Sequence, residues 1–322
     1  MTYARDQQQS DAAGLYSRLT RRAALASVAM ALFLLVLKAW AALETGSMAM
    51  LGSLTDTALD VIAAFVILLG VRLAALPADH DHRFGHGKAE ALVALFQVGL
   101  ITFSAVFILW RAGERLVAGA GPANAEYGIA VSIVSIVATF AVILYQRSVI
   151  RRTRSVAIRS NLLNYQNDLL LNLSVIVALA LDQYAGLTGA DALFGIAIAL
   201  WIGWGAWKAA VHAVDQLMDK EWPEERRDRF VEIVSRHPSV RNLHDLRTRT
   251  SGAREFAQFH IWVPAAMTVA QGHDVMDEIE AALAEEFPGV EIFIHLDPEG
   301  QVDRPGDQLV ETDLAAPYRK PR

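Results

Sequence analysis

Residues 48–76 read MAMLGSLTDTALDVIAAFVILLGVRLAAL, an apolar run long enough to cross the roughly 30 Å hydrocarbon core of a bilayer as a helix. Two acidic residues, Asp56 and Asp60, lie inside this run. Their spacing is about one helical turn, roughly 6 Å along the axis, so both carboxylates point to the same side. A charged carboxylate inside a membrane costs several kcal/mol. The pair therefore needs a divalent cation, a proton or a buried basic group as its partner.

A second polar pair, Asn164 and Asp168, has the same spacing in the fifth apolar segment. Two helices with oxygen ligands at i and i+4 can offer four donor groups to one metal ion, so Asp56, Asp60, Asn164 and Asp168 form a candidate metal site. The alternative is structural, with each Asp capping a broken helix or lining water. Matched spacing on two segments favours the metal site, because ionisable residues inside membrane segments are functional by default.

Composition places the chain among membrane proteins. Of its 322 residues 53% are hydrophobic, and they cluster in runs of about 20, the length of a membrane helix. There is no cysteine, so a metal site must use oxygen and imidazole ligands, which argues against Cu(I). The formal net charge of −6 gives no indication of a nucleic-acid partner.

The pattern predicts four parts: a disordered N-terminal segment (1–17), a transmembrane domain (18–213), a cytosolic metal-binding domain (214–298) and a flexible C-terminal tail (299–322). We expect six transmembrane helices, at about 23–43, 48–76, 91–116, 127–145, 162–181 and 191–211. An even number of spans leaves both termini on one side. Lys and Arg are concentrated in the segments on that side, so the positive-inside rule places both termini in the cytoplasm.

From about residue 221 the composition becomes that of a soluble domain. Helices are expected at 223–237 and 268–287, and strands at 240–250, 254–263 and 290–296. The order αββαβ predicts a small α+β domain of ferredoxin-like or metallochaperone-like type, with helices on one face of an open sheet.

The loop between the second and third spans is rich in metal ligands. Asp79, His82 and His86 lie within it, and glycines allow its backbone to turn so that these side chains converge. Imidazole with carboxylate suits Zn²⁺, Fe²⁺ or Mn²⁺. The alternative is a solvated polar loop in which the histidines are incidental.

A second set of ligand types lies in the soluble domain. It consists of His244, His260, His273, His295 and Asp297. Taken singly, each is more often an ordinary surface residue. As a set on two strands and one helix, they could meet at a sheet edge or a subunit interface and bind metal, and the residues alone leave both readings open.

These features together resemble the cation diffusion facilitator family, and in particular its bacterial ferrous-iron and zinc efflux branch. The resemblance covers about residues 15–298. Its motifs are Asp56-x3-Asp60, the loop string from Pro77 to Glu90 that includes Asp79, His82, His86 and Lys88, Tyr165-Gln-Asn-Asp168, His244-Asp-Leu-Arg-Thr-Arg, and His295-x-Asp297.

The resemblance implies a homodimer in the bacterial inner membrane that exchanges a cytosolic divalent metal (Zn, Fe, Mn or Cd) for an external proton. It implies a transport site at Asp56, Asp60, Asn164 and Asp168 and a loop site at Asp79, His82 and His86. The histidines of the soluble domain and Asp297 would form cytosolic sites that brace two subunits. Lys88 and Asp219 would pair at the dimer junction. No enzymatic activity is expected.

One position departs from the zinc-efflux pattern. Asn164 stands where that pattern has His, so the transport site has four oxygen-donor side chains and no imidazole. Harder oxygen sites suit Mn²⁺ or Fe²⁺ better than mixed sites do, which predicts a shift toward these metals. Proton coupling would then fall to Asp56, Asp60 and Asp168, because close carboxylates raise one another's proton affinity.

Two other functions account for parts of the sequence. A membrane-anchored divalent-metal sensor would bind metal only in its soluble domain, and the intramembrane carboxylates count against it because an anchor does not need them. An intramembrane metalloenzyme is disfavoured because the chain has no HExxH or G-x-S-x-G string at a membrane face.

Overall fold

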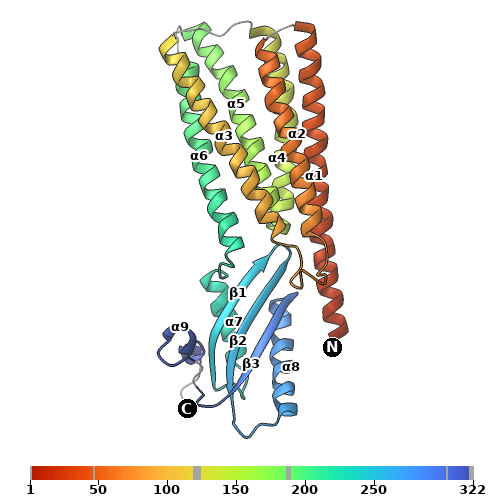
Figure 1. The fold of residues 1–322 in the computed structure, drawn as a ribbon, viewed down its shortest axis with the longest axis vertical. Coiled ribbons are helices and arrows are strands. Elements are labelled where there is room, and N and C mark those ends of the chain that lie inside the picture. Colours follow the sequence, from red (N-terminus) through yellow and green to blue (C-terminus); the bar gives the residue numbers. More distant parts are fainter. Residues whose placement is uncertain (1, 46–47, 119–124, 186–189, 302–303, 319–322) are drawn as a thin grey trace. The chain divides into compact units, whose positions relative to one another are not determined.

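The computed structural model describes the chain except residues 1, 46–47, 119–124, 186–189, 302–303 and 319–322 (Figure 1). In parts of the helices the backbone is described and the side chains are not; Asp56 is one such residue. Within the described chain, six long helices come first: α1 (Thr2–Thr45), α2 (Met48–Ala74), α3 (Ala89–Ala118), α4 (Ala125–Thr153), α5 (Val156–Ala185) and α6 (Ala190–Leu217).

Five of these helices, all except α5, contain a described stretch long and apolar enough to cross a membrane. The fifth helix has 30 residues, which is also sufficient length, but polar residues such as Asn164, Asn167 and Asp168 lower its hydropathy. The sequence predicted a membrane domain of six helices, and the structure confirms a helical membrane domain with about five or six apolar helices.

Residue contacts divide the chain into two compact units. One is Tyr16–Leu217, called the membrane unit here. The other includes the residues from Met218 onward, which are called the C-terminal unit. The first helix already begins at Thr2, whereas the sequence predicted disorder over residues 1–17. A run of good helix formers such as Gln and Ala extends the helix here without any apolar face.

Small residues bring the membrane helices together. Ala23, Ala24 and Ala31 of α1 are buried in one cluster with Ala64 of α2 and Ala157 of α5. Association within a bilayer lacks a hydrophobic driving force, so close packing of small side chains takes its place. The cluster therefore fixes α2 and α5 beside α1.

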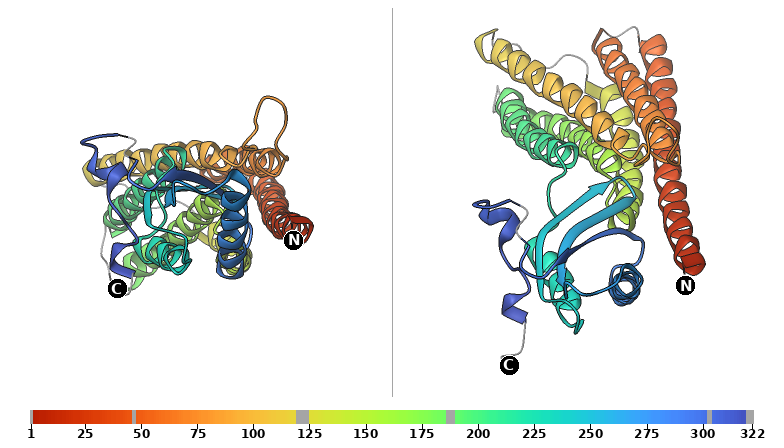
Figure 2. Two further views of the ribbon diagram at one scale, coloured as in Figure 1. Left: turned by 90° about the horizontal axis from the view of Figure 1, so that it is seen from below. Right: turned by 60° about the horizontal axis from the view of Figure 1, so that its bottom comes forward.

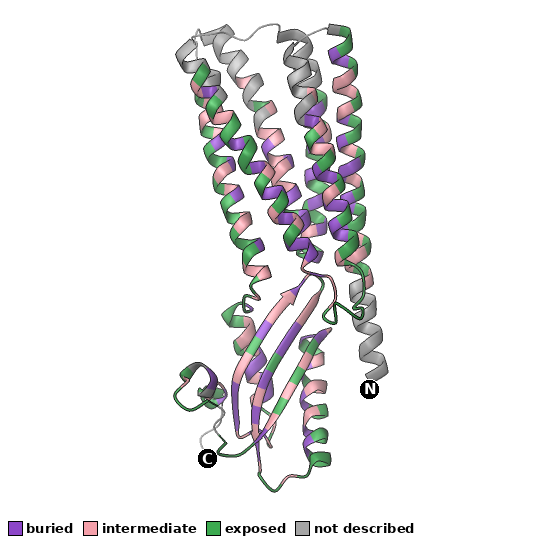
Figure 3. Ribbon diagram, in the orientation of Figure 1, coloured by how far each residue is buried: buried purple, intermediate pink, exposed green. Residues whose placement is uncertain are grey.

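Many large apolar residues of the membrane helices are exposed. Figure 3 shows that exposed and buried residues alternate along these helices. Phe103 and Trp110 of α3 and the stripe Trp201, Trp204 and Trp207 of α6 are more than half exposed. Outward-facing aromatic and aliphatic residues are the pattern expected for contact with lipid.

The C-terminal unit has the predicted αββαβ order, with bounds close to those expected. Its elements are α7 (Glu224–Ser235), β1 (Asn242–Ser251), β2 (Arg254–Val263), α8 (Val269–Glu286) and β3 (Val290–Pro298). The strand order is β1-β2-β3, with β1 antiparallel and β3 parallel to β2. The α+β fold class is confirmed.

Both helices of this unit cover the same face of the sheet (Figure 2). Phe230 of α7 and Leu283 of α8 are fully buried against Phe259 and Ile261 of β2. Thr268 begins α8 with a capping box, because its hydroxyl accepts from the Gln271 N–H while the Gln271 side chain accepts from the Thr268 N–H. The opposite face of the sheet is left for the polar residues described below.

The C-terminal tail packs against β1, which differs from the flexible tail expected from the sequence. The Leu314 N–H donates to the Leu243 carbonyl at 2.8 Å, and Asp313 Oδ1 accepts from the Leu243 N–H at 3.2 Å. Ala315 is fully buried. These contacts satisfy backbone groups at the edge of the sheet, which otherwise would be open to another strand. A short helix, α9 (Gln308–Glu311), precedes them.

Gly70 should be required for the packing of α2 on α3. A Cβ at this position would lie 2.1 Å from Val93 Cγ2, whereas a Cβ at Gly99 of α3 would meet nothing within 4 Å. We expect Gly70→Ala to lower stability by about 1–3 kcal/mol through overpacking, and Gly99→Ala to leave it unchanged or slightly raised. Thermal unfolding in detergent measures both. Restoration of stability by Val93→Ala in the Gly70→Ala background is expected, and an equal loss in both glycine variants would contradict this packing.

Candidate metal-binding sites

The membrane unit brings the two polar helices predicted from the sequence into direct contact. Asn164 Nδ2 of α5 donates to Asp60 Oδ1 of α2 at 3.0 Å. Both side chains are partly buried. The side chain of Asp56 lies outside the described residues, so its part in the site stays a prediction. The contact establishes that polar side chains of α2 and α5 meet inside the bundle.

Asp168 lies one turn further along α5. Asn172 holds the backbone at this turn, since its Nδ2 donates to the Asp168 carbonyl at 2.7 Å. Residues four apart lie on the same side of a helix, so Asp168 is on the side of α5 that presents Asn164.

A buried polar cluster, Ser27, Gln146, Asn161 and Tyr165, ties α5 to α1 and α4. The Ser27 hydroxyl donates to the Ala23 carbonyl at 3.0 Å and accepts from Gln146 Nε2 and Asn161 Nδ2, each at 2.7 Å. Tyr165 Oη donates to the Ser27 carbonyl at 3.0 Å. Because such bonds have no water to compete with them, they fix the rotation of α5. This in turn sets the direction in which Asn164 points.

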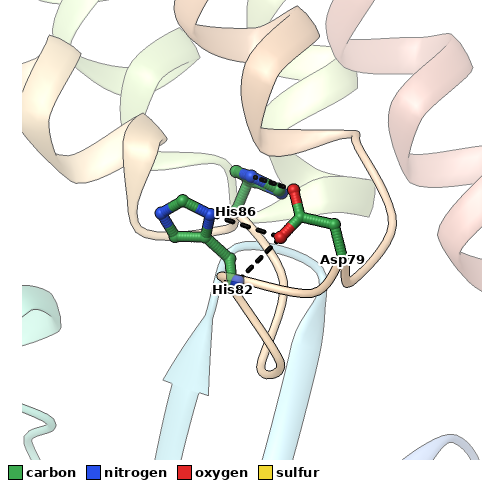
Figure 4. A group of neighbouring side chains, drawn as sticks. All are labelled: Asp79, His82 and His86. Atoms are coloured by element: carbon green, nitrogen blue, oxygen red, sulfur yellow. Dashed lines mark hydrogen bonds and ion pairs between the residues drawn. The ribbon is translucent and has the colours of Figure 1, made fainter.

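Figure 4 shows the loop site, in which Asp79 faces His82 and His86. Asp79 Oδ1 lies 3.4 Å from His82 Nδ1, and Asp79 Oδ2 lies 3.3 Å from His86 Nε2. One ligand atom from each residue lies within 4.8 Å of the other two. Gly85, at φ 80°, makes the turn that brings His86 back toward Asp79. The predicted set is thus brought together by local chain geometry.

The electrostatics of this loop favour a cation. The backbone N–H of His82 donates to Asp79 Oδ1 at 2.7 Å and that of Asp81 at 3.0 Å. These bonds, the one from His82 first, lower the pKa of Asp79 below its usual value, so its carboxylate stays ionised as pH falls. Three ligands of this kind leave a coordination position open, as Zn²⁺, Fe²⁺ or Mn²⁺ sites with exchangeable water do.

The same loop is anchored to two transmembrane helices just beyond the site. Lys88 Nζ donates to the Leu217 carbonyl at 3.2 Å, at the C-terminal end of α6, where a cation is favoured. Glu90 is fully buried, and Ser155 Oγ donates to its Oε2 at 2.6 Å. Ser155 immediately precedes α5, and its hydroxyl also accepts from the Ile158 N–H at 3.3 Å, as an N-cap residue does. The loop site is therefore tied to the start of the helix that carries Asn164.

The third site, called the sheet site below, lies on the face of the sheet opposite α7 and α8. Cross-strand pairing places His244 of β1 beside His260 of β2, and His260 beside His295 of β3. Asp297 lies close to all three histidines. Its Oδ2 is 3.0 Å from His260 Nδ1 and 3.7 Å from His244 Nε2. Its Oδ1 is 3.1 Å from His295 Nε2. Sheet register alone thus gathers residues that are far apart in the sequence.

The burial of this site fits a metal. His244 is 1% exposed, and neither ring nitrogen has a hydrogen-bond partner among the residues that the structure describes. A buried imidazole without partners is costly, and coordination would satisfy it. A β-bulge between His244 and Arg247 also turns Asp245 toward the site, at φ 48°, with its Oδ2 4.0 Å from His260 Nε2. Arg247 holds that carboxylate through two bonds of 2.9 and 2.8 Å.

The structure leaves some predicted residues untested and adds others. His273 is exposed on α8 and belongs to neither of the two ligand groups found among the described residues. Its role as a ligand, and the pairing of Lys88 with Asp219, stay predictions. Asp245 was missed, although it stands in the motif next to His244. Ser27 and Glu90 were also missed, and their only sequence signal was polarity within or beside an apolar run.

Two family models match the two parts of the chain. The family model described as the cation efflux transmembrane domain matches residues 24–218, and the one described as the cation efflux protein cytoplasmic domain matches residues 222–299. The chain belongs to the cation efflux family. This confirms the resemblance drawn from the motifs and identifies the protein as a membrane-embedded cation-efflux transporter.

Individual relatives cover nearly the whole chain. The cation-efflux pump FieF of Serratia proteamaculans is 40% identical over 283 residues, covering 88% of this chain and 94% of its own length. FieF of Cronobacter sakazakii is 40% identical over 289 residues, covering 90% and 96%. A solved structure of CzrB, described as a zinc transporter and in its Zn form, is 36% identical, covers 27% of this chain and 99% of its own, and has a TM-score of 0.25.

The sheet site should order the strands when metal binds. We expect Zn²⁺ to slow amide hydrogen exchange in β1–β3 of the full-length protein, because coordination removes the open states in which these amides exchange. His260→Ala should abolish this slowing. His237→Ala is the matched control, since His237 contacts Glu278 at 2.8 Å, away from the site. Hydrogen exchange with mass spectrometry measures the effect, and equal protection in the wild type and His260→Ala would contradict metal binding there.

Proposed function

We propose that this protein is a proton-coupled antiporter that exports divalent transition-metal cations of the Zn, Fe, Mn and Cd class from the cytosol. The observation that carries the proposal is the contact between Asp60 and Asn164, which joins the polar turns of α2 and α5 inside the bilayer. Asp168 lies one turn further along α5 from Asn164. With Asp56, these residues would supply oxygen ligands to a metal that has shed its water.

The transported ion is proposed to be Mn²⁺ or Fe²⁺ in preference to Zn²⁺. The amide Oδ1 of Asn164 would bind where an imidazole would otherwise stand, so every ligand is an oxygen. Oxygen ligands suit harder cations, although Zn²⁺ still binds most sites more tightly. The preference is therefore a shift in ratio, and some Zn²⁺ transport remains.

Proton coupling follows from the same residues. When metal leaves, Asp56, Asp60 and Asp168 would be close carboxylates in a medium of low dielectric. Mutual repulsion and desolvation both raise their proton affinity. Protons from the outer side would displace the metal, and alternating exposure of the site would return them to the cytoplasm.

The remaining parts are assigned regulatory and assembly roles. We place both termini in the cytoplasm and the protein in the bacterial inner membrane, as the distribution of Lys and Arg favours. The loop site would hold metal close to the start of α5, to which Glu90 anchors it. The sheet site would bind a resident metal that helps two subunits associate as a homodimer.

A membrane-anchored metal sensor is the second candidate, and the buried His244 with Asp297 favours it. A sensor needs no ligand in α2. Loss of Asp60 would therefore leave a sensor intact and disable a transporter.

Metal flux should require Asp60. In proteoliposomes with an acidic lumen, we expect Mn²⁺, Fe²⁺, Zn²⁺ or Cd²⁺ to enter through proteins whose cytosolic face is outward, because lumenal protons displace the bound metal. Asp60→Ala should abolish uptake. Glu44→Ala, at the exposed end of α1, is the control and should retain it. Uptake that does not depend on the pH gradient would contradict proton coupling. Uptake unaffected by Asp60→Ala would contradict a transport site that includes Asp60.

Asn164 should set the metal preference. We expect Asn164→His to raise the ratio of Zn²⁺ to Mn²⁺ transport roughly tenfold, because one oxygen ligand becomes an imidazole. Asn164→Gln keeps an amide oxygen. It should change the transport rates of both metals more than it changes the ratio of Zn²⁺ to Mn²⁺ transport. Competition between the two metals in the same vesicles measures the ratio directly, and an unchanged ratio in Asn164→His would refute the selectivity argument.

A further inference from the structure

A lysine of the first helix reaches the polar turn of α2. Lys38 lies inside the apolar stretch Gly14–Glu44 of α1, and its Nζ donates to Thr57 Oγ1 at 2.7 Å. Thr57 is 2% exposed and stands between the two acidic residues of α2, directly after Asp56 and three positions before Asp60. The bond therefore holds an ammonium group within about one helical turn of Asp60.

The side chain of Lys38 does not extend toward the nearest membrane surface. Lys38 lies about two turns before the end of α1 at Thr45. A lysine near a helix end usually directs its ammonium toward the interface. Here the donor reaches a buried hydroxyl on the neighbouring helix, at the depth of the carboxylates. Side chains on a helix lean toward its N-terminus, which also directs Lys38 inward from Thr45.

We propose that Lys38 is a fixed counter-charge of the membrane metal site, which weakens metal binding enough to permit release and thereby sets turnover. The proposal rests on the transport function proposed above. Three carboxylates, one ammonium and one divalent cation together carry no net charge, so the loaded site would be neutral within the bilayer. Without Lys38 the loaded site would keep a negative charge and hold the cation more tightly.

Electrostatics gives the sign of this effect. A positive charge within a turn of Asp60 repels a bound divalent cation, and the repulsion is strong because the surroundings are not water. The bond to Thr57 holds the ammonium in one place beside the acidic turn of α2. Lys38 is thus a positioning and affinity-setting residue that contributes no ligand to the metal.

The test is a comparison of flux kinetics in proteoliposomes bearing the full-length protein. Lys38→Gln keeps a donor for Thr57 and removes the charge, and Lys38→Met removes both. We expect each to lower the KM for Mn²⁺ by at least about tenfold and to lower kcat as well, because release slows. Lys38→Arg retains the charge and should restore a KM close to that of the wild type. Lys208→Met is the matched control, since Lys208 Nζ lies over the Trp204 ring, 5.0 Å from its centroid.

The outcomes separate the possible roles. An unchanged KM in Lys38→Gln would overturn the proposal, and so would a raised KM, which indicates a lysine that merely supports the fold. A lowered KM in Lys208→Met as well would show a general charge effect and would also overturn it. Should Lys38→Met not fold, Lys38→Gln decides. Absence of Asp60-dependent flux in the wild type would instead count against the proposed function.

Discussion

The structure depends on how carboxylates are accommodated inside a membrane bundle. Asp60 accepts a hydrogen bond of 3.0 Å from the amide of Asn164, and the neighbouring Thr57 accepts one of 2.7 Å from Lys38. In hydrocarbon these groups would each be costly, so α1, α2 and α5 are held together by the partners they provide for one another. The residues that make the bundle specific are the same residues that form the candidate transport site.

The other polar contacts orient α5 around that site. Ser27 accepts bonds from Asn161 and Tyr165 in the first half of α5, and Ser155, just before α5, donates to Glu90. Glu90 follows the loop that carries Asp79 and His86, so a metal bound in the loop would act on the helix that presents Asn164. In the C-terminal unit, the sheet register that pairs His244 with His260 gives a separate metal-ligand cluster with its own buried core beneath it.

Much of this could be predicted from local patterns. The alternation of residues 254–263, bounded by the turn at Gly252, predicted β2 with its observed bounds. The i, i+4 spacing of polar residues in two apolar runs predicted that α2 and α5 meet at Asp60 and Asn164. The contacts that were missed join distant positions: Ser27 with Asn161 and Glu90 with Ser155 carry no common period. The tail was expected to be loose because few of its residues are apolar, yet Ala315 belongs to the core of the C-terminal unit and Leu314 packs against it.

The most direct test of the account is the location of the transported ion within the membrane unit. Crystals of the full-length protein grown with Mn²⁺, measured at a wavelength where manganese scatters anomalously, would show its position. The account predicts an anomalous peak between Asp60 of α2 and Asp168 of α5, absent in Asp60→Ala. Peaks confined to the histidine-containing sites of the loop and the sheet, with none between α2 and α5, would contradict it.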